Sequence, residues 1–221
     1  DPLGPENRLI FGAGPFTGTR MPSTGRHAIV ARSPLTGSFA ESDVGGRWGT
    51  RLRGAGLDVL DIRGASSQPV ILIINEDSAR IEDGSHLWGL DAYETADAIR
   101  ETHGPKSEIA AIGPAGERQV LLASVMHDGR HGRAAGRCGL GAVMGAKGVK
   151  AVVVSGNKTA PAADPDGLRT HVKDILGRIK ASSAYLRQYG TAGGLMCLEA
   201  SGDMPIRNFS WGKWGNAEKI T

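Results

Sequence analysis

Residues 139–156 read GLGAVMGAKGVKAVVVSG, a glycine-rich turn into a short apolar helix that is followed by a strand of valines. An earlier stretch has the same order, with VGGRWG at 44–49 and VLDIRG at 59–64. A Gly-Pro pair and a strand-like segment precede each copy, at Gly14-Pro15 and at Gly113-Pro114. This weak internal repeat predicts two similar β-sheet units, each with a glycine loop that enters a helix.

A glycine loop at the start of a helix is suited to bind an anion, because unpaired backbone N–H groups point out of the helix end. Two such loops predict two similar anion sites related by a pseudo-two-fold axis. A divergent duplication that binds no ligand is the alternative, and the spacing alone leaves both open.

The composition excludes several classes of protein. The 221 residues, with 40% hydrophobic and 22% charged side chains, are typical of an ordinary globular chain, and 33 glycines indicate many tight turns. The formal charge of +3 comes without any block of like charge, which argues against a nucleic-acid partner. No apolar run is long enough for a membrane span and no signal-peptide pattern is present, so we expect a cytoplasmic protein with no membrane partner.

Strands and helices are predicted from the periodicity of apolar residues and from the Gly and Pro that bound them. The expected strands are 9–11, 27–31, 59–62, 70–74, 109–112, 120–125 and 151–154. The expected helices are 50–55, 92–102 and a long one at 165–189. A polar connector at 157–166 suggests a domain boundary, so we expect a β-rich domain at 1–160 and the start of a mainly helical domain at 161–221.

The segment 129–145 is the richest in candidate binding residues. Arg130, Arg133 and Arg137 stand among glycines there, an arrangement suited to phosphate or pyrophosphate because guanidinium groups bind the oxygens in pairs. A solvated surface loop is the alternative. The dinucleotide fingerprint is incomplete, since Met144 stands where its last glycine belongs.

Metal and nucleophile chemistry find little support in the residues themselves. His127 and His131 lack a third ligand for zinc. Cys138 and Cys197 are too few for a disulfide scaffold or for an iron–sulfur cluster, which needs about four thiolates. Any cluster must therefore be ligated elsewhere.

The sequence as a whole resembles the tungsten-dependent aldehyde ferredoxin oxidoreductase family. The matching stretches run in family order: DPLGPENRLIF (1–11), GPFTGT (14–19), STGR (23–26), RSPLTG (32–37), GGRWG (45–49), HLWG (86–89), IGPAGE (112–117), RAAGR (133–137) and GAVMGAKGVKAVVVSG (141–156). The resemblance implies an α+β fold in which two related β-sheets form a base for a paired pterin cofactor, followed by the start of a helical domain. It also implies that the N-terminal strands of the family domain lie before residue 1.

The resemblance implies specific cofactor contacts. Tungsten, or molybdenum, would be held by two pterins, with a magnesium ion between their phosphates and a [4Fe–4S] cluster ligated outside these residues. The expected cofactor-binding residues are Arg26, Asp43, Gly45, Gly46, Arg133, Ala134, Gly136 and Arg137. The backbone carbonyls of Asp43 and Ala134 would bind the magnesium, and Arg26 would lie between pterin and cluster. Asp43 stands where the family often has Asn, and Cys138 where a glycine is frequent.

The implied activity is oxidation of a small aldehyde to a carboxylate, with electrons passed to ferredoxin or an equivalent carrier. A subunit of an aromatic acyl-CoA reductase of the same family is one alternative, and a non-catalytic module that keeps the fold is another. The family's catalytic pocket and cluster cysteines match nothing in these 221 residues, so no catalytic residue is assigned and this part alone is expected to be inactive. A homo-oligomer is compatible with the sequence.

Overall fold

The computed structural model describes residues 1–220. Its contacts divide the chain into a first unit, Asp1–Pro165, and a second unit from Asp166 onward. Within residues 1–220, no helix is both long enough and apolar enough to cross a lipid bilayer.

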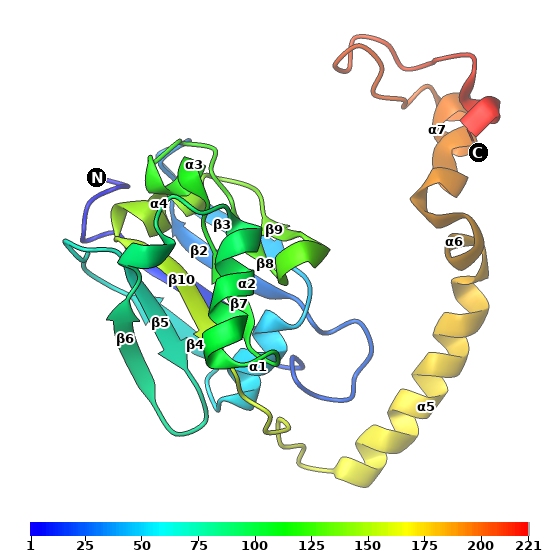
Figure 1. Ribbon diagram of the computed structural model, residues 1–221. Helices are drawn as coiled ribbons and strands as arrows, with labels where there is room; N and C mark the ends of the chain where they lie inside the picture. The colour runs from blue at the N-terminus through cyan, green and yellow to red at the C-terminus, as the bar shows by residue number, and fades with distance from the viewer. Residues whose placement is uncertain (221) are drawn as a thin grey trace. The chain divides into compact units, whose positions relative to one another are not determined.

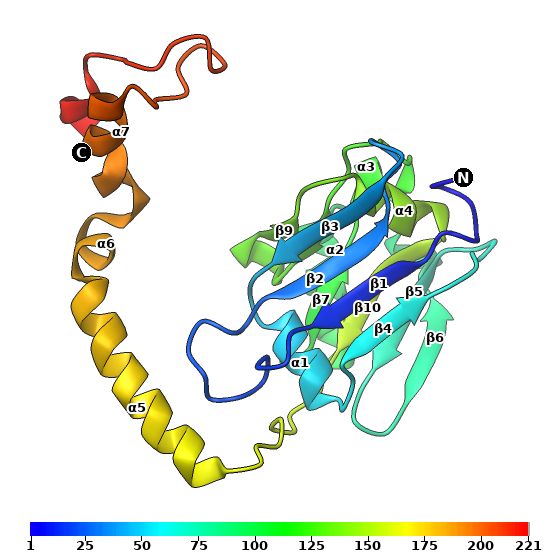
Figure 2. The same cartoon turned by 180° about the vertical axis from the view of Figure 1, so that it is seen from behind.

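The first sheet has four antiparallel strands in the order β3-β2-β1-β4 (Figure 2). The strands are β1 (Leu9–Ala13), β2 (His27–Arg32), β3 (Phe39–Val44) and β4 (Val59–Ile62), with helix α1 (Trp48–Gly54) between β3 and β4. Leu9, Phe11 and Ile29 are fully buried, whereas their neighbours in the strands point to the other face. No helix of the first unit covers that outer face in Figure 2.

The second sheet has six strands in the order β6-β5-β10-β7-β8-β9. The strands are β5 (Val70–Ile74), β6 (Ala79–Asp83), β7 (Glu108–Ala111), β8 (Val125–His127), β9 (Arg133–Ala135) and β10 (Val149–Val154). Only the pairing of β5 with β10 is parallel. All six residues of β10 are buried, as expected for a central strand with both faces covered.

The predicted repeat is confirmed by the topology. The series β1-β2-β3-α1-β4 gives the strand order β3-β2-β1-β4, and the series β7-β8-β9-α4-β10 gives β9-β8-β7-β10, with α4 at Leu140–Ala146. The β5–β6 hairpin and helix α2 (Ala92–His103) lie between the two copies in the chain. The expectation of an α+β fold with two related sheets is therefore correct.

Two hydrophobic cores hold the first unit together. The larger one fills the space between the sheets, where Trp48 of α1 and Met144 of α4 pack between Phe11 of β1 and Val152 of β10. The smaller one lies on the other face of the six-stranded sheet, which α2 covers (Figure 1), and includes Ile99 of α2 and Val153 of β10. Because β10 alternates Val152 and Val154 into one core with Ala151 and Val153 into the other, this strand joins both.

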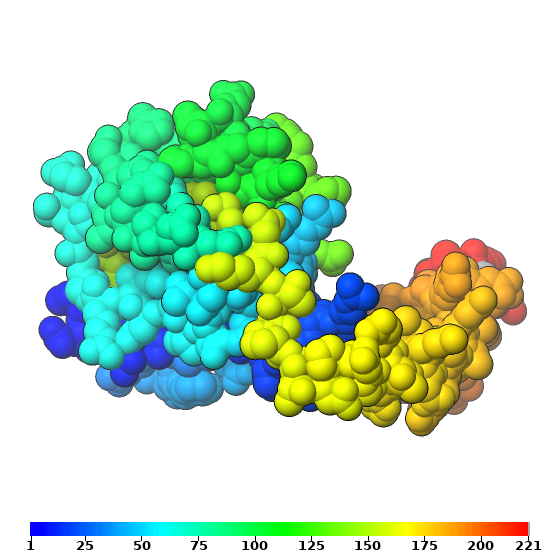
Figure 3. Space-filling model, turned by 90° about the horizontal axis from the view of Figure 1, so that it is seen from below, coloured from blue at the N-terminus to red at the C-terminus, as the bar shows by residue number. Residues whose placement is uncertain are grey.

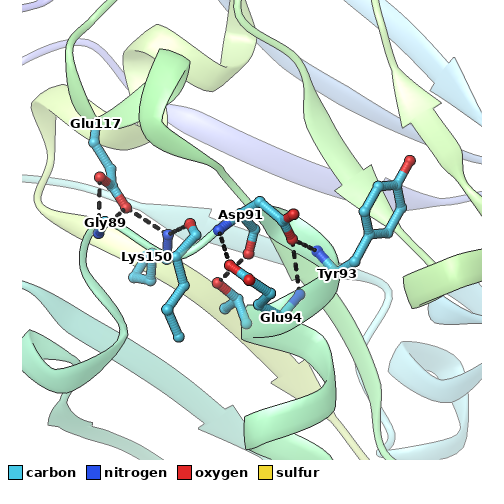
Figure 4. Close-up of polar contacts among 8 residues, drawn as sticks. Gly89, Asp91, Tyr93, Glu94, Glu117 and Lys150 are labelled. Atoms are coloured by element: carbon cyan, nitrogen blue, oxygen red, sulfur yellow. Dashed lines mark hydrogen bonds and ion pairs between the residues drawn. The ribbon is translucent and has the colours of Figure 1, made fainter.

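A buried lysine ties the start of α2 to β10 (Figure 4). The Lys150 side chain is fully buried; its ammonium donates to the carbonyl of Leu90 at 2.8 Å and pairs with Glu117 of α3 (Pro114–Glu117). Glu117 also accepts from the backbone N–H of Gly89 at 3.0 Å. Burial lowers the pKa of Lys150, and Glu117 opposes that shift. Next to this pair, Asp91 and Glu94 form the capping box that begins α2.

The end of the first unit runs along α1 as an extended segment. The backbone N–H of Lys158 donates to the carbonyl of Gly54 at 3.0 Å. The guanidinium group of Arg51 in α1 donates to the carbonyl of Gly156 at 3.2 Å. In Figure 3 this segment lies over the atoms of α1. The segment therefore covers the helix that follows the first glycine loop.

The second unit is helical, with α5 (Pro165–Ser182), α6 (Ala184–Tyr189) and α7 (Leu195–Ser201). Short 3₁₀ turns lie at Ser85–Leu87 and Gly129–His131 in the first unit and at Gly190–Gly194 and Ala217–Ile220 in the second. The single helix expected at 165–189 is broken at Ser183, whose hydroxyl donates to the carbonyl of Ile179 at 2.6 Å. Such side-chain bonds to the preceding turn compete with the helix.

The strand expected at 120–125 is wrong except at its last residue. Val120, Leu121 and Leu122 are exposed, and the N–H of Ala123 donates back to the carbonyl of Val120 at 2.8 Å, as in a turn. The N–H of Gly141 at the start of α4 donates a hydrogen bond to the carbonyl of Ala123 at 2.9 Å. This segment is apolar without being in a sheet, so its composition gave a false strand signal.

Candidate functional site

An open groove of about 620 Å³ lies where β3 of the first repeat meets the end of β9 of the second. It is lined by Arg26, Glu41, Ser42, Asp43, Ala134, Gly136 and Arg137. Five of the eight sequence-predicted cofactor residues are among these seven, namely Arg26, Asp43, Ala134, Gly136 and Arg137. The structure thus brings together residues that are more than 90 positions apart in the chain.

The groove is built from matching backbone positions of the two repeats. Val44 of β3 lies opposite His27 at the start of β2, and Ala135 of β9 lies opposite Val125 at the start of β8. One residue back, Asp43 and Ala134 are therefore equivalent. One residue on, Gly45 and Gly136 are equivalent in the same way. Of these four positions, Asp43, Ala134 and Gly136 line the groove, whereas Gly45 is not among its lining residues.

The fold itself does not require glycine at Gly45 or Gly136. A Cβ at Gly45 would meet no atom within 4 Å, and one at Gly136 would meet its nearest neighbour, Ser124 Oγ, only at 3.9 Å. Neither residue has a positive φ. A glycine that the protein does not need is consistent with close approach by a ligand.

Other glycines of the two loops are explained by the protein. Gly46 has φ +100° and Gly139 has φ +71°, which L side chains rarely adopt. A Cβ at Gly46 would collide with the carboxylate of Asp128, and one at Gly139 with the carbonyl of Leu121. Gly46, predicted as a cofactor contact, is therefore required for the loop whether or not it also touches a ligand.

The groove carries two arginines and two carboxylates that are not paired with one another or with other groups of residues 1–220. The guanidinium groups of Arg26 and Arg137 make no hydrogen bond or ion pair with residues 1–220, and the carboxylates of Glu41 and Asp43 make none either. Arg133 has no partner in the described part of the chain. It is exposed on β9 one residue before Ala134 and does not line the groove. Charged groups that lack protein partners are available for an ionic ligand.

Hydrogen bonds beside the groove join the two repeats. The N–H of Arg137 donates to Ser42 Oγ at 3.3 Å, and the hydroxyl of Ser33 donates to the carbonyl of Cys138 at 2.8 Å. Sequence reasoning missed Glu41, Ser42 and Ser33, because neither their residue type nor their spacing marks them as site residues. Only the register of β3 against β2 places Ser42 on the buried side of the groove.

Two buried histidines lie beside the first glycine loop. The Nε2 atoms of His27 and His127 are 3.2 Å apart, and His27 stacks on Trp48 with ring centroids at 4.8 Å. The hydrogen-bond network assigns the proton of His127 to Nδ1, which faces the carbonyl of Val125 at 3.3 Å. Burial lowers the pKa of His27 to about 4, and burial together with His27 lowers the pKa of His127 well below its usual range. Both rings are therefore neutral near pH 7.

A smaller pocket of about 250 Å³ lies beside the same loop. It is lined by Arg47, Arg100, Pro105, Glu108, Asp128 and His131. Burial, and then the charge of Asp128, raises the pKa of Glu108, while Arg100 at 3.6 Å and Arg47 at 4.0 Å oppose the shift. Because Arg47 and Arg100 already pair with Glu108, this pocket suits an anion less well than the groove, where the arginines have no such ion pair.

Side chains alone do not form a metal site in residues 1–220, where no group of three or more His, Cys, Asp or Glu could hold an ion. A cation at the groove would need other donors, and the backbone carbonyls of Asp43 and Ala134 occupy matched positions for this. The groove offers an anionic group the bare backbone of Gly136 and two arginines without protein partners, while Glu41 and Asp43 offer carboxylate oxygens to a cation.

Comparisons with known proteins identify the family. Residues 1–156 match the family model described as aldehyde ferredoxin oxidoreductase, N-terminal domain. A tungsten-containing aldehyde ferredoxin oxidoreductase of Pyrococcus furiosus is 42% identical over 216 residues, which are 96% of this chain and 35% of the relative. The WOR-like subunit of an aliphatic sulfonate oxidoreductase from the same organism is 33% identical over 95% of this chain and 35% of its own length.

A solved structure is also similar to this chain in fold and sequence. The active-site complex BamBC of benzoyl coenzyme A reductase, in complex with 1,5-dienoyl-CoA, matches with a TM-score of 0.79 and 43% identity over 82% of this chain and 27% of that chain. This chain spans about a third of the length of the curated relatives described above. The chain belongs to the aldehyde ferredoxin oxidoreductase family, and its residues 1–156 correspond to the family's N-terminal domain.

Proposed function

We propose that the first unit binds the paired pterin cofactor of a tungsten oxidoreductase in the groove between β3 and β9. The observation that carries this proposal is the equivalence of Asp43 with Ala134 and of Gly45 with Gly136 in the two repeats. A cofactor made of two like halves needs two like binding positions, and the repeats supply them. The tungsten named in the relatives is consistent with this cofactor.

The residues of this chain bind and orient the cofactor. Gly45 and Gly136 let the backbone approach each half, because neither presents a Cβ. Arg26 and Arg137 donate hydrogen bonds to anionic groups, and Arg133 adds positive charge on β9. When bound, the metal–pterin group supplies the two-electron redox chemistry, which no side chain of this chain offers.

A magnesium ion between the two phosphates is part of the proposal. The carbonyls of Asp43 and Ala134 would bind it as hard oxygen donors. The Asp43 side chain is exposed at the groove and has no partner in residues 1–220, so its negative charge would also face the cation. This charge distinguishes the site from relatives with Asn at that position.

The activity that we propose for the whole protein is oxidation of an aldehyde with water to a carboxylate. Two electrons would leave through a [4Fe–4S] cluster, ligated outside these residues, to ferredoxin or an equivalent carrier. Arg26 would lie between pterin and cluster.

The test uses the full-length protein purified from its native host. We expect tungsten, or molybdenum, with two pterins and about four irons per chain, and aldehyde-dependent reduction of a viologen dye. Protein that lacks both metal and pterin would contradict the proposal and favour a non-catalytic module with the same fold.

A second candidate is a subunit of an aromatic acyl-CoA reductase. It is favoured by the 43% identity to the benzoyl coenzyme A reductase structure. Both candidates use the same cofactor groove, so the groove does not distinguish them. Aldehyde oxidation without aromatic acyl-CoA turnover would support the first, and the reverse result would support the second.

A further inference from the structure

Two consecutive residues at the end of β8, His127 and Asp128, reach from the second repeat into the first. Both are buried, with 0% and 8% of their surface exposed. Asp128 has φ +60°, a conformation uncommon outside glycine that turns the chain sharply after the strand. Neither residue lines the groove.

Asp128 supports the first glycine loop from the side of the smaller pocket. Its Oδ1 accepts the backbone N–H of Arg47 at 3.2 Å. Its other oxygen occupies the place that a Cβ of Gly46 would take, so carboxylate and loop are in direct contact. The carboxylate therefore fixes the backbone of Gly46 and Arg47 both by a hydrogen bond and by packing.

The same loop packs onward against the start of β2. The carbonyl oxygen of Gly46 lies 3.2 Å from the position that a Cβ of Gly25 would take. Gly25 directly precedes Arg26, which lines the groove. A displacement of the loop would thus be passed to the backbone that carries Arg26.

His127 makes the second contact to the same region. Its Nε2 accepts a hydrogen bond from Nε2 of His27, the residue that follows Arg26. Arg26 therefore lies between two contacts from the second repeat, one through Gly46 and Gly25 and one through His27. When the pairings of β2 and of β8 are matched between the two repeats, Val30 is the first-repeat equivalent of Asp128. Valine has no carboxylate, so the second repeat supports the loop of the first repeat, and the first repeat has no equivalent contact to the second.

We propose that Asp128 and His127 are positioning residues for the cofactor groove. They hold Arg26 and the loop Gly45–Gly46 at the geometry that the cofactor requires, although they do not touch it. This inference rests on the proposed function, and it adds residues that the resemblance to the family did not mark.

The test compares three substitutions in the full-length protein. Asp128→Asn keeps an oxygen that accepts the Arg47 N–H, whereas Asp128→Ala removes it. We expect Asp128→Ala to release pterin and tungsten about tenfold faster than wild type, because a lost hydrogen bond to a charged group has about that effect. Asp128→Asn should stay near wild type. Asp97→Ala is the matched control, since it breaks only the exposed pair of Asp97 with Arg130 nearby.

Hydrogen exchange of the Arg47 amide gives a readout that does not depend on activity. We expect faster exchange of this amide in Asp128→Ala but not in Asp128→Asn or Asp97→Ala, with cofactor bound or removed. His127→Phe, which keeps a ring but loses the bond to His27, should release cofactor faster than wild type.

Equal Arg47 exchange in wild type and Asp128→Ala would overturn the positioning role, and so would equal cofactor release. If Asp128→Ala does not fold, Asp128→Gly removes the same carboxylate from a position whose φ of +60° glycine adopts readily, and unchanged Arg47 exchange in it would also overturn the proposal. A wild-type protein without pterin would instead overturn the proposed function, while Arg47 exchange would still decide whether Asp128 fixes the loop.

Discussion

Gly45 and Gly136 show how much a residue can reveal when the fold does not explain it. Neither has a positive φ, and neither would clash with the protein if it carried a side chain. The two glycines stand at the same position of two repeats that have diverged almost everywhere else. At the residue scale, the site is therefore marked by two glycines whose lack of a side chain the fold does not require.

The first prediction concerns these glycines. Gly45→Val and Gly136→Val in the full-length protein should lower pterin and tungsten content severalfold while changing the melting temperature little, since the added groups meet open space. Gly139→Val is the control for folding. Its side chain would collide with the carbonyl of Leu121, and the φ of +71° at this position is one that valine rarely adopts. Cofactor analysis and thermal unfolding measure the two effects. Full cofactor occupancy in either groove variant would contradict the assigned binding positions.

The second prediction separates the arginines. Charge-assisted contacts contribute about 1.5–3 kcal/mol each, and lysine cannot reproduce the planar fork of arginine. Arg133→Lys and Arg137→Lys should therefore both weaken cofactor retention. If only Arg137→Lys does so, Arg133 is a solvated surface residue, as its place outside the groove lining allows.

Arg26→Lys should keep most of the tungsten but shift the cluster potential and slow turnover. An unchanged potential and turnover would exclude the bridging role of Arg26.

The third prediction is a pH dependence that arises from His27. Its pKa is about 4 in the folded chain and near 6.5 when unfolded, so the unfolded chain takes up the proton first as the pH falls. The free energy of unfolding should be highest above pH 6.5, and His27 should contribute on the order of 3 kcal/mol to its drop between pH 6.5 and 4, to which the lowered pKa of His127 adds. Urea unfolding of this chain across that range measures the drop. His27→Phe should show a smaller drop, and an equal one would refute the assignment.

At the element scale, strands with two buried faces or regular alternation could be predicted, whereas groove strands could not. β5 and β10 are runs of Val, Ile and Leu, and such runs are read directly. β3 and β9 were missed because FAESDV and RAA present polar or small residues to the groove. The apolar run at 120–125 was read as a strand although it turns.

The residues of the candidate site could be predicted from the sequence only where they lie in the family motifs. Arg26, Asp43, Ala134, Gly136 and Arg137 were assigned from those motifs, and the structure places all five on one groove. Ser42, His127 and Asp128 were not assigned, because their roles depend on contacts across the two repeats. Such contacts depend on strand register in three dimensions, which spacing along the chain does not give.

The fourth prediction concerns the link between β10, α3 and the start of α2. Glu117→Ala leaves the fully buried ammonium of Lys150 without its carboxylate and should lower the free energy of unfolding by about 3–5 kcal/mol. The double variant Lys150→Met with Glu117→Leu should be more stable than Glu117→Ala, because it removes both charges. Asp97→Ala, which breaks an exposed pair with Arg130, is the control and should cost less than about 1 kcal/mol. Urea titrations measure these differences, and a double variant no more stable than Glu117→Ala would contradict a coupled pair.

At the scale of the whole molecule, the proposed function implies that the groove is one wall of a larger site. This chain covers about 35% of its curated relatives, and its groove is open. The fifth prediction is that residues 1–221 alone fold but do not oxidise aldehydes. Aldehyde-dependent viologen reduction by this chain, reconstituted with cofactor, would refute it, and the full-length protein is the positive control.

The parallel pairing of β5 with β10 has a consequence for the order in which the chain acquires structure. The four-stranded sheet contains only residues 9–62 and can form early, because its pairings are local. The six-stranded sheet cannot close until β10 arrives, since that strand pairs with both β5 and β7. During synthesis on the ribosome, the β5–β6 hairpin therefore waits with an unpaired apolar edge until residue 154 has emerged. That interval is when the nascent chain is most exposed to aggregation and to capture by chaperones.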